Sequence, residues 1–303
     1  MIELQRILCA VDFSDFSRHA LDHALGVARC YRSTVTALHV AAPLPAAVAG
    51  GYYFGSENPP PLMLPRMDVD TATRELQRLV TTEQVPGVSI ETRVAEAFTV
   101  HAEILAQADR LRADMVVMGT HGRSGFERVF LGSTAEKLLR KARCPVMTVA
   151  PKAPDTMPTG PVPFSRIVCA VDFSESARVA LDYAMSLAQE SAADLTLVHV
   201  VETHPLYVDF APPVAIDFAA WTGQATNRLH QLVLGPVRAA CSVTEVVREG
   251  LPDREILKLA RERGADLIVL GVRGRRRAAD LLFGSTTHHV IREARCAVLT
   301  LRG

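Results

Sequence analysis

The chain has 303 residues, 49% of them hydrophobic, and its 33 Lys and Arg residues balance 33 Asp and Glu residues. This length suits two domains of ordinary size, and the lack of a basic excess argues against nucleic acid as a partner. No apolar run reaches the roughly 18 residues that a membrane span requires. Because the opening residues, MIELQRILCAVDFS, lack the features of a secretory signal peptide, we expect a cytoplasmic protein with no membrane partner.

The first half of the chain alternates short apolar strands with amphipathic helices. Strands are predicted over residues 6–11, 34–40, 88–94, 115–118 and 146–149, and helices over 17–30, 69–82, 101–111 and 133–142. The strands are apolar on both faces, which indicates a parallel sheet covered by helices on both sides. Residues 41–65 are rich in proline and aromatic residues and form a lid, an oligomer contact or an ordinary surface loop.

The second half repeats the first in order and spacing. RILCAVDFSDFSRHALDHAL, from Arg6, matches RIVCAVDFSESARVALDYAM, from Arg166, and the later strands and loops match in turn. Between the copies, the proline-rich residues 151–163 read as a stiff, extended linker. We therefore expect α/β architecture: a first domain over 1–150 and a second over 164–303. Each is a doubly wound, Rossmann-like domain with a five-stranded parallel sheet.

A glycine-rich loop follows the fourth predicted strand in each half. The two loops read GTHGRSGFERVFLGST from Gly119 and GVRGRRRAADLLFGST from Gly271. In open parallel sheets, ligands bind beyond the carboxyl ends of strands one and four, where these loops lie. We interpret the first two glycines of each loop as positions that adopt positive φ and let a ligand approach the backbone closely.

Each loop ends in Gly-Ser-Thr at the predicted start of a helix. Ser133 with Glu136 predicts a capping box, whereas His288 replaces the glutamate in the second half. A helix N-terminus offers N–H groups and a partial positive charge to phosphate. The sequence thus predicts one phosphate site in each half.

Asp12 and Asp172 end the first strand of each half. Either they cap the following helix, or they face a polyphosphate. A carboxylate is useful beside a polyphosphate only if it accepts a ribose hydroxyl or helps to hold Mg²⁺. The dinucleotide fingerprint, the P-loop and the nucleophile elbow are all missing from the sequence.

These features together resemble the universal stress protein family in its tandem form. The resemblance rests on AVDFS at Ala10 and Ala170, LHV and VHV in the second strands, ARCPV and ARCAV before the last strands, and the glycine loops. It implies the universal stress protein/adenine nucleotide alpha hydrolase-like fold and ATP as the ligand, with or without Mg²⁺. It also implies that the halves pack as an intrachain pseudo-dimer, and it leaves open a further homodimer and unknown protein partners.

By this resemblance, the aspartates touch the ribose–phosphate region, the valines that end the second strands meet adenine, and the loops cradle phosphates. The implied site residues of the first half are Ala10, Val11, Asp12, Val40, Met118, Gly119, Gly122, Arg123, Gly132, Ser133 and Thr134. Those of the second half are Ala170, Val171, Asp172, Val200, Leu270, Gly271, Gly274, Arg275, Gly284, Ser285 and Thr286.

The halves depart from each other at two places. After the third strand, the second half has the family's usual Gly-x-Pro, but the first has Ala97, no proline and one extra residue. We therefore expect the first site to differ locally. In the second loop, Arg273, Arg275, Arg276 and Arg277 either clamp phosphates or form a solvated basic loop.

No catalytic residue is predicted, because neither a general base nor a nucleophile repeats near the expected phosphates. His39 and His199 repeat inside apolar strands and read as core residues, as do Cys9 and Cys169. Three functions are consistent with the sequence. The first is an ATP-binding stress-response regulator or sensor with little turnover. The second is a slow ATPase or self-phosphorylating protein, and the third is an interaction module that binds no nucleotide. In the second case, Ser133, Thr134, Ser285 and Thr286 offer the nearest hydroxyls.

Overall fold

The computed structural model describes residues 2–41, 68–83, 86–120, 131–150, 164–202, 218–233, 235–272 and 284–302. The predicted linker, 151–163, lies outside these ranges. So does the segment 41–65 beyond its first residue.

Every strand and helix predicted for the first half is present, with bounds that differ by at most two residues. The elements are β1 (Arg6–Ala10), α1 (Asp15–Tyr31), β2 (Thr34–Ala41), α3 (Val69–Thr82), β3 (Ser89–Glu96), α4 (Val100–Leu111), β4 (Met115–Gly119), α5 (Ser133–Lys141) and β5 (Val146–Val149).

The second half repeats this order and adds the short helix α8. Its elements are β6 (Arg166–Ala170), α6 (Glu175–Ser191), β7 (Asp194–Glu202), α7 (Phe218–Leu232), α8 (Gly235–Ala240), β8 (Val243–Gly250), α9 (Pro252–Arg263), β9 (Leu267–Val272), α10 (Ser285–Glu293) and β10 (Ala297–Arg302).

The strands form one ten-stranded sheet in the order β3-β2-β1-β4-β5-β10-β9-β6-β7-β8. Within each half all described pairs are parallel, so the expected pair of doubly wound five-stranded sheets is confirmed. Between the halves, β5 pairs antiparallel with β10, with Met147 opposite Leu299. The two copies therefore share a single sheet, which the sequence did not indicate.

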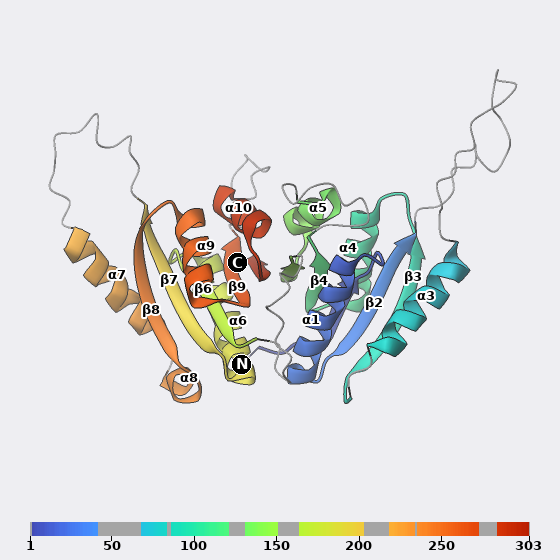
Figure 1. Cartoon of the computed structure of the whole chain (residues 1–303), viewed down its shortest axis with the longest axis horizontal. Coiled ribbons are helices and arrows are strands. Elements are labelled where there is room, and N and C mark those ends of the chain that lie inside the picture. The colour runs from blue at the N-terminus through green and yellow to red at the C-terminus, as the bar shows by residue number, and fades with distance from the viewer. Residues whose placement is uncertain are drawn as a thin grey trace, which may run out of the picture.

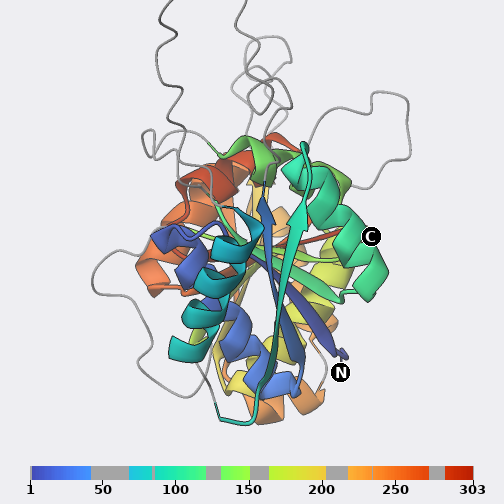
Figure 2. The same ribbon diagram turned by 90° about the vertical axis from the view of Figure 1, so that its right-hand side faces the viewer.

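Helices cover both faces of this sheet. One core joins α1 and α3 to α6 and α7 through residues such as Leu21, Leu76 and Leu181. The other core joins α4 and α5 to α9 and α10, with Leu138 and Ile291 among its members. In Figures 1 and 2, α5 and α10 lie near each other at the middle of the molecule and on the same side of it. The carboxyl ends of both sheets consequently face the same side.

Side chains reinforce the contact between the halves. The Thr300 hydroxyl donates to the Val146 carbonyl at 3.0 Å, and the Tyr31 and Ser186 hydroxyls lie 2.9 Å apart. Arg302, at the end of β10, donates to the Leu139 carbonyl at 2.8 Å. That carbonyl lies in the last turn of α5, where a cation also compensates the helix dipole.

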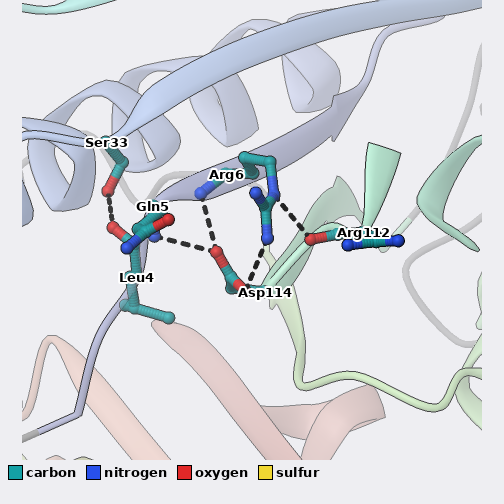
Figure 3. Close-up of polar contacts among 6 residues, drawn as sticks. All are labelled: Leu4, Gln5, Arg6, Ser33, Arg112 and Asp114. Atoms are coloured by element: carbon teal, nitrogen blue, oxygen red, sulfur yellow. Dashed lines mark hydrogen bonds and ion pairs between the residues drawn. The ribbon is translucent and has the colours of Figure 1, made fainter. Parts of the chain in front are cut away.

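At the amino ends of the strands in each half, an aspartate ties the first strand to the fourth, as Figure 3 shows for the first half. One oxygen of Asp114 accepts from the backbone N–H groups of Gln5 and Arg6, both at 2.8 Å. The Arg6 side chain then donates from Nε to the Arg112 carbonyl at 2.8 Å. In the same view, the Ser33 hydroxyl donates to the Leu4 carbonyl.

The second half repeats this arrangement with Asp266. Its two carboxylate oxygens accept from the N–H groups of Ser165 at 2.7 Å and Arg166 at 3.0 Å. Arg166 Nε donates to the Gly264 carbonyl at 2.8 Å. The aspartate before the fourth strand is therefore a structural residue in both halves, remote from the carboxyl ends where a ligand is expected.

We predict that Asp114→Ala lowers the free energy of unfolding by about 1–3 kcal/mol, because two backbone N–H groups lose a charged acceptor. Urea denaturation measures the change. Asp109→Ala is the control: Asp109 is exposed at the end of α4, and we expect its change to stay within about 0.5 kcal/mol. Equal effects of the two substitutions would contradict this assignment.

Candidate functional site

The expected site residues at the strand ends lie side by side. Ala10 of β1 is paired with Met118 of β4, and Ala170 of β6 with Leu270 of β9. Beyond β1, the Val11 N–H still donates to the Leu38 carbonyl of β2 at 2.8 Å. The chain is thus held in line with the sheet up to the residue before Asp12.

Asp12 supports the cap of α1 without being the cap itself. Its Oδ1 accepts from the Ser14 N–H at 3.1 Å and from the Ser14 hydroxyl. Ser14 is the N-cap residue, and its hydroxyl oxygen accepts from the Ser17 N–H at 3.3 Å. Asp172 and Ser174 repeat the arrangement in the second half. Of the two readings of the aspartate, direct helix capping is therefore wrong.

The residue after each aspartate has an unusual backbone conformation. Phe13 has φ 64° and Phe173 has φ 61°, in the left-handed region that costs a residue with a Cβ roughly 1–2 kcal/mol. Each ring packs against a histidine of the neighbouring strand: the centroids lie 4.5 Å apart for Phe13 and His39 and 4.6 Å apart for Phe173 and His199. Sequence reasoning missed both phenylalanines, although the repeated DFS triplet was a signal for them.

The two histidines have hydrogen-bond partners, as expected of core residues. His39 Nδ1 lies 2.8 Å from the Val11 carbonyl oxygen, and His199 Nδ1 lies 2.7 Å from that of Val171. Because a carbonyl only accepts, Nδ1 is the donor in both rings. In both rings, Nδ1 is therefore not available to act as a general base.

At the ends of the second strands, Val40 is paired with Ala95 of β3, and Val200 with Arg248 of β8. The turns that follow the third strands differ between the halves. In the second half, Gly250 has φ 139° and Pro252 begins α9. In the first half, Ala97, Phe98 and Thr99 form a turn one residue longer, without positive φ. Phe98, in this turn, is 79% exposed.

The described glycines of the loops do not have the positive φ that we expected. Gly119 is the last residue of β4, and Gly271 lies within β9. Neither glycine has positive φ. A Cβ on Gly271 would lie 2.5 Å from the backbone of Ser176 and Ala177. Gly271 therefore allows α6 to pack closely on β9. Gly122, Arg123, Gly274 and Arg275 lie outside the described residues.

The capping box at α5 is also wrong. Gly132 is the N-cap residue and, as a glycine, makes no side-chain cap hydrogen bond. Ser133 is the first helical residue, and Glu136 binds Arg140 at 2.7 Å instead of reaching back. Gly284 is likewise the N-cap of α10, without a side-chain cap. Within the described ranges, the N-cap residues of both helices therefore provide no side-chain acceptor for the first N–H groups, an arrangement that suits an anion.

The charged residues between α4 and α5 differ from those between α9 and α10. In the first half, burial and the positive charges of Lys141 and Lys137 lower the pKa of His101, in the first turn of α4. In the second half, Asp253 in the first turn of α9 lies 3.5 Å from His289 Nδ1 on α10. The surroundings of α5 and α10 are thus not equivalent in charge.

Cysteine chemistry and direct metal binding find no support in the part of the chain that the structure describes. Burial raises the pKa of Cys169 to about 12 and that of Cys9 further still, so both remain protonated. No group of three or more His, Cys, Asp and Glu residues within the described ranges could hold a metal ion.

A cavity of about 480 Å³ lies between the halves. Its lining includes His19 and His23 of α1, Arg261 of α9, and Ala150 and Ser165 at either side of the linker. It therefore borders the amino ends of β6 and β9 and not the strand ends where the aspartates lie.

These observations define a class of protein: a tandem α/β chain in which each half places a strand-end aspartate and an uncapped helix N-terminus at the carboxyl edge of a parallel sheet. The model of the universal stress protein family matches residues 3–150 and 163–302. The chain belongs to this family.

Two relatives illustrate the match. Universal stress protein MJ0531 of Methanocaldococcus jannaschii is 31% identical over 148 residues, which is 48% of this chain and 81% of the relative. A universal stress protein of Mycolicibacterium smegmatis is 26% identical over 305 residues, with 98% of this chain and 96% of the relative covered.

Solved structures share the whole fold. The crystal structure of a universal stress protein from Archaeoglobus fulgidus covers 99% of this chain and is itself covered to 99%, with a TM-score of 0.66 and 20% identity. No helix within the described ranges is both long and apolar enough to cross a membrane.

We predict that Gly271→Ala destabilises the protein by about 1–3 kcal/mol or more, because the added Cβ meets backbone that cannot move aside cheaply. Gly284→Ala is the matched control, since the nearest atom to its Cβ is 3.9 Å away and its φ is −49°. Thermal unfolding compares the two variants. If both melt like the parent chain, the packing role of Gly271 is refuted.

We predict that Cys9 and Cys169 do not react with iodoacetamide at pH 8 in the native protein. A pKa far above 8 leaves almost no thiolate, which is the nucleophilic form. Peptide mass mapping should show modification of both only after denaturation. Cys30 and Cys241, two of the four cysteines with intermediate exposure, serve as internal comparisons.

Proposed function

We propose that this protein binds ATP at one site in each half and acts as a stress-response regulator or sensor with little or no turnover. The single observation that carries the proposal is the repeated combination of an uncapped Gly-Ser-Thr helix start and a strand-end aspartate. Membership of the universal stress protein family supports the stress-response role at the level of the family.

In this proposal, the N–H groups at the starts of α5 and α10 donate hydrogen bonds to the phosphates, and the Ser133 and Ser285 hydroxyls are additional donors. Asp12 and Asp172 accept ribose hydroxyls, and backbone groups of Val40 and Val200 meet adenine. A lone carboxylate suits Mg²⁺ only alongside nucleotide phosphates and water. We therefore propose that any Mg²⁺ arrives with the nucleotide.

The proposal includes the division into domains at 1–150 and 164–303 with the linker 151–163 between them. It also includes action in the cytoplasm through protein partners that remain to be identified, with or without pairing of two chains.

Little turnover is expected because the strand-end groups of the described chain already have other roles. The histidines donate to backbone carbonyls, and one oxygen of each aspartate accepts from the serine cap. A γ-labelled ATP assay separates this reading from a slow ATPase or a self-phosphorylating protein. Release or transfer of label at the 1–100 per second typical of kinases would refute the regulator.

We predict that calorimetry finds two ATP molecules per chain and that Gly274→Val reduces this number to one. A valine side chain would block close approach of a phosphate to the backbone, while the loop position should leave the fold intact. Gly223→Val, on α7 with no atom within 4 Å of its Cβ, is the matched control and should keep both sites.

Two results would contradict the proposal. One is an absence of bound ATP in calorimetry together with an absence of nucleotide in the gently purified protein, which would favour an interaction module. The other is an unchanged stoichiometry in the Gly274→Val variant.

A further inference from the structure

We propose that His39 and His199 are positioning residues that aim the strand-end aspartates at the nucleotide. This inference rests on the proposed function, since it assigns a task to residues beneath the same sites. Each histidine contacts the chain on both sides of the aspartate, at the carbonyl of the residue before it and at the ring of the residue after it.

The contact is the same in both halves. His39 Nδ1 donates to the Val11 carbonyl at 2.8 Å, and its ring lies 4.5 Å from that of Phe13 at an angle of 38°. For His199, the corresponding values are 2.7 Å to Val171, 4.6 Å to Phe173 and 46°. The repeated AVDFS segments and the histidines of the second strands thus build the same three-residue clamp in both halves.

The turn needs such a clamp because its central residue is held in an unfavourable conformation. Glycine adopts the left-handed region without steric cost, yet both halves place phenylalanine there. The ring therefore offsets the strain through a contact that glycine could not make. That contact is with the histidine, whose own ring is fixed by its hydrogen bond to the strand.

The clamp determines where the carboxylate points. Val11 is held by His39 and by the sheet, since its N–H donates to Leu38. On the far side of the turn, Ser14 binds Asp12 Oδ1 and caps α1. Asp12 lies between two fixed points, and release of the first would let the turn relax and the carboxylate swing.

The second half adds a further layer. The guanidinium carbon of Arg228, on α7, lies 3.8 Å from the centre of the Phe173 ring, a cation–π distance. Arg228 follows the buried Ala225 by three residues; in α3, the residue three beyond the buried Ala72 is Glu75. A carboxylate is not attracted to the face of an aromatic ring. Loss of the histidine should therefore harm the first site more than the second.

The test measures each site separately in the full-length chain, with ATP and Mg²⁺ in calorimetry. In a Gly274→Val background, which leaves the first site, we expect His39→Ala to weaken ATP binding about tenfold, as for one positioned hydrogen bond to an aligned group. In a Gly122→Val background, His199→Ala should weaken binding about threefold, and addition of Arg228→Ala should bring the loss to about tenfold.

Two more variants guard against trivial explanations. His39→Asn keeps a donor near the Val11 carbonyl but lacks the ring, so we expect an intermediate loss of affinity. Thr36→Val changes another buried polar residue of β2 and should leave affinity unchanged. Hydrogen–deuterium exchange of the peptide spanning Cys9–Ser17 supplies a second readout, and we expect faster exchange in His39→Ala with little change elsewhere.

The outcomes separate the two proposals. If the parent chain binds no ATP, the proposed function fails, and the nucleotide role of the histidines fails with it; exchange still reports whether they hold the turn. If the parent binds two ATP molecules but His39→Ala leaves both the affinity and the exchange unchanged in a folded chain, the positioning role is overturned. Faster exchange with unchanged affinity also overturns it, because the histidine would then be structural only.

Discussion

The antiparallel pairing of β5 with β10 is the contact on which the rest of the architecture depends. Each half alone would end in an open strand, which exposes unpaired N–H and C=O groups and invites association. The pairing gives the N–H and C=O groups at the edge strand of each half partners in the other half. It also makes the core on each face of the sheet continuous across the two halves. Because the two strands run in opposite directions within a twisted sheet, both sets of carboxyl ends face one side of the molecule (Figure 1).

Physical periodicity explains what could be predicted from the sequence. Strands buried on both faces and helices with a regular apolar stripe leave a clear pattern, and the predicted bounds differ by no more than two residues. The pairing of β5 with β10 left no such pattern, since β5 is only four residues long and its partner lies in the other copy. Nothing in its apolar run distinguishes a central strand from an edge strand.

The glycine loops show where residue patterns become ambiguous. Sequence reasoning took Gly119 and Gly271 as space for a ligand, but Gly271 makes space for α6. It took Ser133 as the cap of α5, but the cap is Gly132, one residue earlier. That one-residue shift matters, because a glycine cap has no side chain to occupy the N–H groups. The left-handed backbone conformation of Phe13 and Phe173 was missed for a related reason, because propensities assign that conformation to glycine or asparagine. The contact that explains the exception is with a histidine 26 residues later in the chain.

Covalent linkage of the two copies changes how the pairing of β5 with β10 responds to dilution. When two separate chains pair through such strands, the fraction paired falls as the protein becomes scarce. Here β5 and β10 belong to one chain, so their encounter is intramolecular and its probability is set by the connection between the halves. The ten-stranded sheet should therefore persist at any protein concentration, and a change in the amount of protein would alter the number of such sheets without altering their assembly.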